Sequence, residues 1–117
     1  MALQPMTPDA LADTPTVFAS FMGEGDARKK TVRELLEIYR ERSKSLRAGE
    51  DRDDDLRVER FIDDMANERW RDEVIMRIGV FSGTTLVIDG IHRAIAYLAC
   101  VEQGISSERL PALCVER

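Results

Sequence analysis

The spacing of apolar residues changes twice along this chain, and these changes constrain the fold more than any other feature. Between residues 31 and 71, apolar side chains recur at intervals of three and four residues, which is typical of amphipathic helices. Residues 74–88 are instead rich in β-branched and aromatic side chains around a Ser82-Gly83-Thr84 turn, as in a β-hairpin. Helical spacing returns at residue 91. The sequence therefore predicts an α+β fold, in which helices pack with a small sheet.

We predict a single domain over residues 31–117, preceded by an N-terminal arm at residues 1–30. The expected elements are a helix at 32–47, an acidic linker at 50–55, a helix at 56–71, a hairpin at 73–88, a helix at 91–103 and a strand at 110–115. Thr31 and Glu34 have the spacing of a capping box, in which each side chain accepts a hydrogen bond from the backbone of the other residue. That pair defines the start of the first long helix.

Three further polar residues are predicted to cap helices. Thr7 and Thr14 each precede a proline, the residue favoured at the first helical position, so short helical turns are expected in the arm. Asp55 closes the acidic linker and is expected to cap the helix that follows. The linker lacks the ligand order and the glycine of an EF-hand loop, so we predict no metal site there.

Composition and charge limit the cellular compartment and the classes of binding partner that we expect for this chain. The chain of 117 residues has 22 acidic and 17 basic side chains and a net charge of −5, which argues against nucleic acid as a partner. Its apolar runs are far shorter than a membrane span of about 20 residues. Cys100 and Cys114 lack the spacing of a zinc site, and the N-terminus has no signal-peptide core. We therefore expect a cytoplasmic protein with free thiols and no membrane association.

The junction after the hairpin contains most of the chemical information. Asp89-Gly90-Ile91-His92-Arg93 follows a strand and opens an apolar helix. The first amides of a helix have no partner within the helix and favour anions, and a glycine allows a phosphate to approach the backbone. His92, the single histidine, and Arg93 would add side-chain donors in the first turn. The pattern suits a diphosphate or triphosphate.

Each residue of this junction also has a structural interpretation. A lone histidine is more often a structural residue than a ligand, and Asp-Gly is a common turn. Arg93 can form an ion pair with Asp89. Asp89 can also be a turn or cap residue with no catalytic role. The residues by themselves leave the phosphate site and these structural roles open.

The segment also resembles the signature of the ParB/sulfiredoxin-like superfamily. Members of that superfamily have a Gly-x-His-Arg style motif between a strand and a helix, and Leu110-Pro111-Ala112-Leu113 resembles their closing Ile-Pro-x-x-Val strand. The resemblance covers residues 56–117, about half the chain. It implies a ParB/sulfiredoxin-like small mixed sheet packed with helices, preceded here by a helical N-terminal addition.

The resemblance implies that Gly90, the backbone of Ile91, His92 and Arg93 contact nucleotide phosphates, with ATP or CTP and Mg²⁺ as the ligands. The catalytic cysteine of sulfiredoxin would fall at Ile91, which excludes sulfinic-acid reduction through this position. Because partition proteins continue into further helices after the closing strand, we expect no complete partition clamp. A nucleotide-binding core with its own N-terminal addition is the remaining expectation.

If the site is catalytic, phosphoryl transfer needs donors for the transferred group and a carboxylate that orients the acceptor. His92, Arg93 and the helix terminus would supply the donors, and Asp89 would be the carboxylate that orients the acceptor and holds the metal. Asp89 and His92 are therefore the candidate catalytic residues. Glu24 and Asp26 are candidates for a lid, and Arg69 and Arg71 are weaker candidates for phosphate contacts. The acceptor would be a small molecule or a protein.

We therefore predict an ATP-dependent phosphotransferase or NTPase. Two alternatives stay open: a non-catalytic protein-interaction module, including a homodimer, and a DNA-associated partition or regulatory accessory.

Overall fold

The structure is a computed structural model that describes residues 3–16, 30–45, 53–70, 74–81 and 84–116. Within these ranges the chain forms four strands, four α-helices and one short 3-10 helix. In chain order they are β1 (Leu3–Pro5), α1 (Pro8–Ala12), α2 (Val32–Ser45), α3 (Asp53–Ala66), β2 (Val74–Phe81), β3 (Thr84–Asp89), α4 (Ile91–Glu102), η2 (Ser107–Arg109) and β4 (Leu113–Glu116). The predicted α+β class is confirmed.

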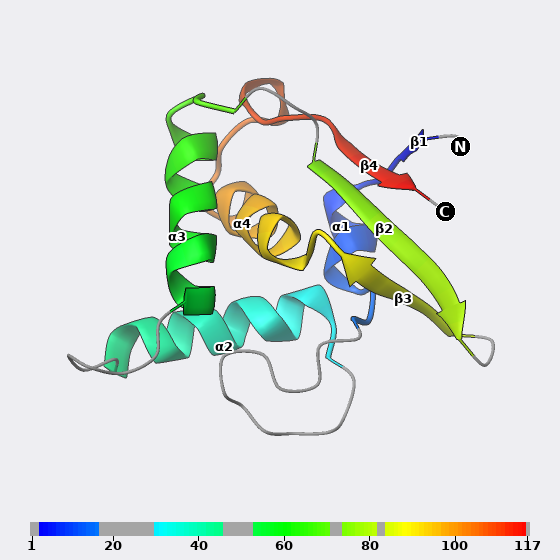
Figure 1. Cartoon of the computed structure of the whole chain (residues 1–117). Coiled ribbons are helices and arrows are strands. Elements are labelled where there is room, and N and C mark those ends of the chain that lie inside the picture. The colour runs from blue at the N-terminus through cyan, green and yellow to red at the C-terminus, as the bar shows by residue number, and fades with distance from the viewer. Residues whose placement is uncertain (1–2, 17–29, 46–52, 71–73, 82–83, 117) are drawn as a thin grey trace.

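The four strands form one mixed sheet in the order β1-β4-β2-β3 (Figure 1). β4 runs parallel to β2, whereas the two outer pairs are antiparallel. β2 and β3 make the predicted hairpin, and Arg77 lies opposite Asp89 in their register, next to an irregularity between Arg77 and Ile78. The end of β3 that leads into α4 therefore lies beside the middle of β2.

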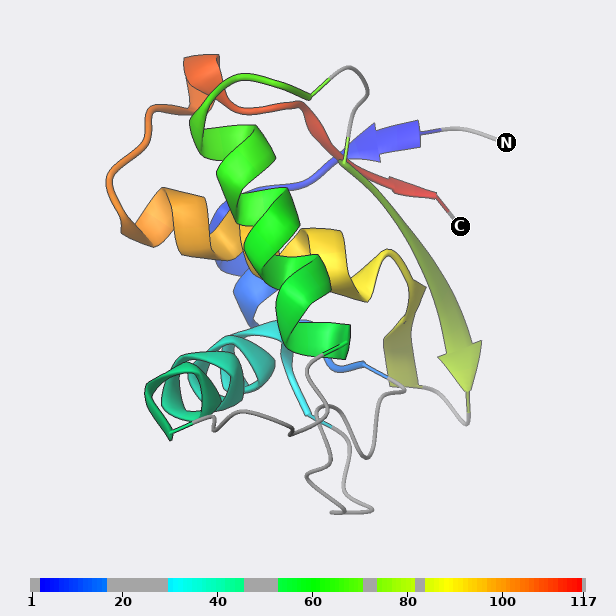
Figure 2. The same cartoon turned by 60° about the vertical axis from the view of Figure 1, so that its left-hand side comes forward.

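The core of the protein is built around α4. Residues 94–100 of this helix are buried without interruption, so it is covered on every side rather than along one stripe. Figures 1 and 2 show α4, in yellow and orange, enclosed by α1, α2, α3 and the sheet, and the helices contact it directly. Because the middle of α4 is fixed by the core, its first turn is held in a defined place next to β3 and α3.

α2 starts with the predicted capping box. The amide of Thr31 donates to Oε1 of Glu34 over 3.1 Å, and the amide of Glu34 donates to Oγ1 of Thr31 over 3.2 Å. Val32, Leu35 and Leu36 follow on the buried face of the helix. The helix is described as far as Ser45, and its predicted end at residue 47 lies outside the described residues.

The predicted bounds of the next helix, residues 56–71, are wrong at both ends. α3 already begins at Asp53, since acidic side chains are stabilised in the first turn by the helix dipole. Asp55 is therefore inside the helix and does not cap it. Its side chain is buried, with 2% exposed, and its Oδ2 lies 3.4 Å from a guanidinium nitrogen of Arg42 on α2. This ion pair joins α2 to α3.

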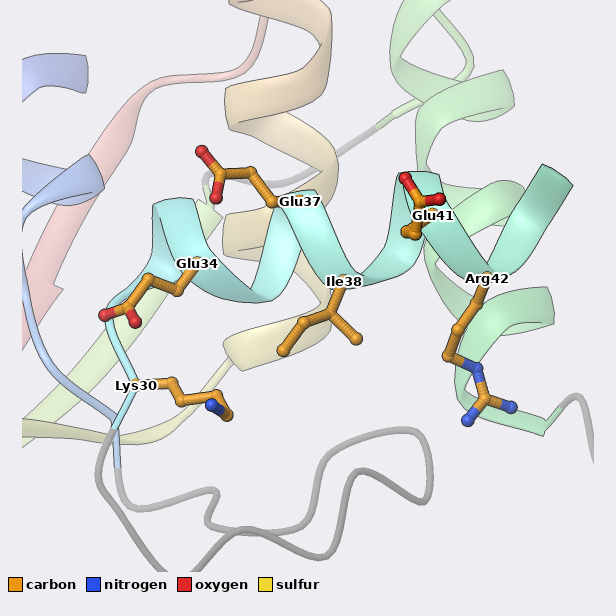
Figure 3. A pocket seen from close by; sticks show the side chains of 6 residues that line it. All are labelled: Lys30, Glu34, Glu37, Ile38, Glu41 and Arg42. Atoms are coloured by element: carbon orange, nitrogen blue, oxygen red, sulfur yellow. The ribbon is translucent and has the colours of Figure 1, made fainter. Parts of the chain in front are cut away.

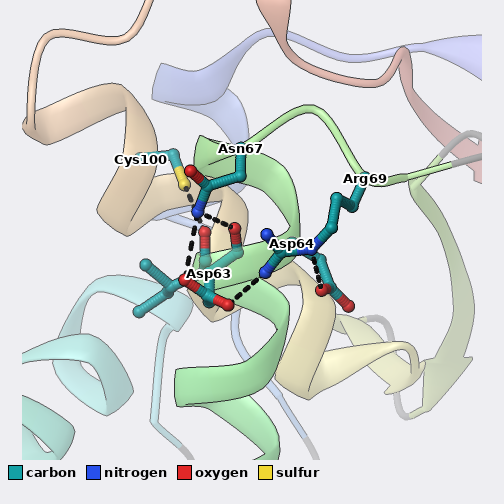
Figure 4. A network of polar contacts seen from close by, with 6 residues as sticks. Asp63, Asp64, Asn67, Arg69 and Cys100 are labelled. Carbon is teal, nitrogen blue, oxygen red and sulfur yellow. Dashed lines mark hydrogen bonds and ion pairs between the residues drawn. The ribbon is translucent and has the colours of Figure 1, made fainter.

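α3 ends at Ala66, because Glu68 adopts a left-handed conformation with φ of 56° that a helix cannot continue through. A network of polar contacts surrounds this end (Figure 4). The Nδ2 of Asn67 donates to the carbonyl oxygen of Asp63 over 2.8 Å. Arg69 bonds the carboxylates of Asp63 and Asp64. These contacts fold the chain back over the last turn of α3.

The arm and the last strand also differ from the prediction. Thr7 caps α1 as expected, accepting from the amide of Ala10 over 3.2 Å. No second helical turn follows Thr14; instead Pro15 bridges to Thr31, and Thr16 bridges to Val87 of β3. The remaining apolar residues of the arm, at 17–22, lie outside the described residues.

β4 begins at Leu113 rather than at residue 110. The 3-10 helix η2 ends at Arg109, and Leu110 and Pro111 are buried without joining a strand ladder. β1, which the sequence did not predict, is a three-residue strand containing a proline, and it pairs with β4 at the sheet edge.

Cys100 and Cys114 are free thiols, the first buried in α4 and the second half-buried in β4. None of the described helices is both long enough and apolar enough to cross a bilayer.

Candidate functional site

The predicted junction has the geometry of an open helix start. Gly90 follows β3 and precedes α4 with φ of 82° and ψ of 16°, a left-handed conformation that glycine adopts without strain. It provides no side-chain cap for the helix, and its carbonyl oxygen accepts from the amide of Ala94 over 3.0 Å. The amides of Ile91, His92 and Arg93 belong to the first turn, where helices have no internal acceptors for their N–H groups. This is the arrangement that the sequence predicts for a phosphate.

Asp89 turns its side chain back onto this junction. Its Oδ1 accepts from the amide of Gly90 over 2.9 Å, and the carboxylate is otherwise exposed. Among the described residues Asp89 forms no ion pair with Arg93, so that structural alternative does not hold. The carboxylate lies at the start of the helix, where the sequence predicts an acidic candidate.

His92 is not directed into solvent but toward α3. Its Nε2 lies 2.7 Å from Oδ1 of Asp54, and 17% of the histidine side chain and 32% of the aspartate side chain are exposed. At this distance the two atoms share a hydrogen bond, whose ionic character depends on the protonation of the imidazole. The site therefore includes a carboxylate that the sequence analysis did not identify.

Arg93 also contacts α3. The Cζ atom of its guanidinium lies 5.2 Å from the centre of the Phe61 ring, a cation–π contact, while the side chain as a whole is exposed. A guanidinium has five N–H donors, and those of an exposed arginine remain accessible to oxygen atoms while its positive charge is attracted to an aromatic ring. Arg93 can therefore bind an anion without leaving Phe61.

Both basic side chains of the motif rest on one face of α3. Asp54, Val58, Phe61 and Met65 recur at the spacing of successive helical turns, and Val58 and Met65 are buried. The last three residues form an apolar stripe with the three- and four-residue spacing that predicts a helix in this part of the sequence. Extending the same stripe by one turn toward the N-terminus leads to Asp54, which is the signal that could have identified this residue.

Ile91 is buried, so only its backbone faces the junction, as the resemblance implies. Arg77, which the sequence analysis did not select, is exposed on β2 opposite Asp89, and its Nε lies 3.6 Å from a carboxylate oxygen of Glu116. No local sequence signal marks Arg77, because its position depends on the strand register.

Of the other candidates from the sequence, Arg69 is the one that the structure describes, and it does not reach this junction. Arg69 is bound to Asp63 and Asp64 at the far end of α3 (Figure 4). Glu24, Asp26 and Arg71 lie outside the described residues.

A cavity of about 440 Å³ lies along α2 (Figure 3). It is lined by Lys30, Glu34, Glu37, Ile38, Glu41 and Arg42. Glu34 belongs to the capping box and Arg42 holds Asp55, so two of its charged groups already stabilise the fold. None of the residues of the predicted phosphate site lines this cavity.

The donor set of the junction fits a magnesium nucleotide better than a metal held by protein alone. The part of the chain that the structure describes has no group of three or more metal-ligating side chains. Mg²⁺ usually needs only one or two carboxylates together with phosphate oxygens. Asp89 is exposed at the helix start, so it is the residue that would hold the ion, which would neutralise phosphate charge.

Comparisons of this chain with protein-family models, with curated proteins and with solved structures give no match. The ParB/sulfiredoxin-like resemblance stays a prediction.

Proposed function

We propose that the start of α4 binds the phosphates of a nucleoside triphosphate, with ATP or CTP and Mg²⁺ as the ligand. On this proposal the protein is an ATP-dependent phosphotransferase or NTPase of the cytoplasm. The observation that supports it most is the open start of α4, where Gly90 takes a left-handed conformation and leaves the helix without a side-chain cap. Oriented backbone amides at such a start attract anionic oxygens.

The side chains at the junction suit the same ligand. Arg93 is exposed, and its cation–π contact with Phe61 limits its rotation. A guanidinium held in this way binds phosphate through charge-assisted hydrogen bonds with less loss of side-chain entropy. We assign Arg93 and the amides of Ile91 and His92 to phosphate binding.

The catalytic assignments follow from the two carboxylates and the imidazole. His92 would supply a side-chain N–H donor beside the first turn of α4, and in the structure its Nε2 bonds Asp54. Asp89 would orient the acceptor hydroxyl or water and hold the magnesium ion. A small molecule or a protein side chain would accept the phosphoryl group in a phosphotransferase, and water in an NTPase.

Isothermal titration of the full chain with ATP, CTP and GTP in the presence of Mg²⁺ tests the proposal. We expect binding by at least ATP or CTP, and a loss of about 1.5–3 kcal/mol of binding free energy in Arg93→Ala, since charge-assisted hydrogen bonds are removed. No binding by the wild type would contradict the proposal.

Arg33→Ala is the matched control for that substitution. Arg33 is also exposed and lies 3.5 Å from Glu102, at the last residue of α4 and therefore at the opposite end of the helix. The control removes the same charge near the same helix but should leave nucleotide affinity unchanged. An equal loss in both variants would indicate that net charge, and not the junction, determines binding.

A protein-interaction module is the second candidate, and one observation favours it. Among the described residues the exposed large apolar side chains are Leu56 and Ile88, with 46% and 43% exposed. Leu56 lies two residues from Asp54, the partner of His92, and Ile88 lies two residues from Gly90 of the junction. Light scattering of the wild type and of Leu56→Ser with Ile88→Ser tests this alternative. A dimer that the double substitution dissociates would support it, and a wild-type monomer would contradict self-association.

A further inference from the structure

The contact between Asp54 and His92 links the first turns of two helices. Asp54 belongs to the first turn of α3, and His92 to the first turn of α4. Nε2 of the imidazole is bonded to Oδ1 of Asp54 over 2.7 Å. A carboxylate oxygen and a phosphate oxygen have the same requirement, namely a positively polarised N–H group. Asp54 therefore occupies the same donor that a bound phosphate would use.

The exposure of the pair allows this contact to be exchanged. Asp54 keeps 32% of its side chain in contact with solvent, so the carboxylate can be hydrated when the imidazole leaves. The neighbouring Asp55 differs, because it is buried and paired with Arg42 of α2. The start of α3 is therefore fixed by Asp55, while Asp54 can release its partner without displacing the helix.

We infer that Asp54 is an internal acceptor that competes with the phosphates for His92 and so regulates the site. This inference rests on the proposed nucleotide binding at α4. Without ligand, Asp54 holds the imidazole on α3. When phosphates reach the amides of α4, their charge repels the carboxylate, His92 transfers its hydrogen bond to a phosphate oxygen, and Asp54 turns to solvent. Part of the binding free energy is used in this exchange, so affinity is lower than without the competitor.

Asp54→Asn tests the competition. The substitution keeps the size of the side chain and its position in the first turn but removes the negative charge from the group that accepts from Nε2 of His92. We expect affinity for ATP with Mg²⁺, and for inorganic tripolyphosphate, to rise about three- to tenfold in this variant. A structural role alone predicts unchanged or weaker binding, because the imidazole would lose its support.

Asp63→Asn is the matched control. Asp63 lies on the same helix and pairs with Arg69, so the substitution also removes one charge and one ion-pair partner. It is nine residues from Asp54, about 14 Å along the helix axis, which exceeds the screening length of about 8 Å at physiological salt. Affinity should be unchanged in this variant. An equal rise in both variants would overturn the competition in favour of a net-charge effect.

The single histidine provides a second measurement that does not depend on the variant. In an untagged wild-type protein all imidazole ring signals in the NMR spectrum belong to His92. Saturation with tripolyphosphate should shift these signals, since the ring exchanges Asp54 for the ligand. Unmoved ring signals, when calorimetry shows binding, would overturn the competition and leave the proposed function intact. Absence of binding by both the wild type and Asp54→Asn would overturn the proposed function and the competition together.

Discussion

His92 and Asp54, which are 38 residues apart in the sequence, meet with Nε2 and Oδ1 at 2.7 Å where the first turns of α4 and α3 come together. This contact gives the only histidine a fixed orientation. It also connects the candidate phosphate site to the packing of the two helices. His92, which was selected from the sequence for its chemistry, therefore also takes part in the contact between α4 and α3.

The first prediction concerns the stability of that contact. We expect His92→Ala, Asp54→Ala and the double variant to form a cycle with a coupling of about 1 kcal/mol, the range of a partly exposed charge-assisted hydrogen bond. Urea unfolding followed by circular dichroism measures it. In the coupling energy of the cycle, the separate contribution that Asp54 makes through the dipole of α3 cancels. Additive losses in the two single variants would show that the contact does not stabilise the fold.

The second prediction separates backbone strain from phosphate access at Gly90. Gly90 and Gly104 have similar left-handed conformations, with φ of 82° and 87°, near opposite ends of α4. Alanine at either position should lower the free energy of unfolding by about 1–2 kcal/mol. Only Gly90→Ala should also weaken nucleotide binding, because its new methyl group stands at the amides of the first turn.

Unfolding and calorimetry on both variants test this second prediction. The space around a Cβ atom at Gly104 is empty to 4 Å, so that variant reports the backbone cost alone. Equal nucleotide affinity in the two variants would contradict the assigned site.

The third prediction compares two arginines of α2. Arg42 pairs with Asp55, whose side chain is 2% exposed, whereas Arg40 pairs with the more exposed Glu102. Arg42→Ala should lower the free energy of unfolding by about 2–3 kcal/mol, because a buried carboxylate loses an ion-pair partner. Arg40→Ala should cost less than about 1 kcal/mol, as surface ion pairs do. Similar losses in chemical denaturation would contradict the importance of the α2–α3 link.

The fourth prediction concerns high pH. Burial raises the pKa of the Cys100 thiol and the pKa of the Tyr97 hydroxyl above their usual values of 9.0 and 10.0. At a pH between the unfolded and folded values, the unfolded chain binds fewer protons than the folded one. The contribution of these two groups to the free energy of unfolding is therefore fully present below the usual pKa of the thiol, and it decreases as the pH rises above that pKa.

Thermal unfolding from pH 7 to 10.5 measures this decline. Cys100→Ala and Tyr97→Phe should each flatten it, since neither replacement ionises. A wild-type stability that rises over this range would contradict the prediction.

The local parts of the fold could be predicted from the sequence, whereas the contacts between elements could not. Thr31 and Glu34 form their capping box because the signal is contained in four consecutive residues. Gly90 opens α4 for the same local reason. The pairing of Asp55 with Arg42 depends on how α2 and α3 are both placed against α4, so the acidic run around Asp55 was interpreted as a linker.

The candidate site shows the same division. The junction from Asp89 to Arg93 was identified from a strand, a glycine and a helix start that follow one another in the chain. Asp54 and Phe61 reach it only through the packing of α3 on α4, and Arg77 only through the strand register. Functional side chains next to a turn can be recognised in the sequence. Residues that reach the site from other helices or strands can be identified only once the fold is known.

The most direct measurement of the central claim is an NMR titration of the backbone amides with ATP and Mg²⁺. We predict that the largest shifts occur at the amides of Ile91, His92 and Arg93, with smaller changes at the far end of α4. If the signals of these three amides do not shift at saturating nucleotide, the account is contradicted, whether or not other signals shift.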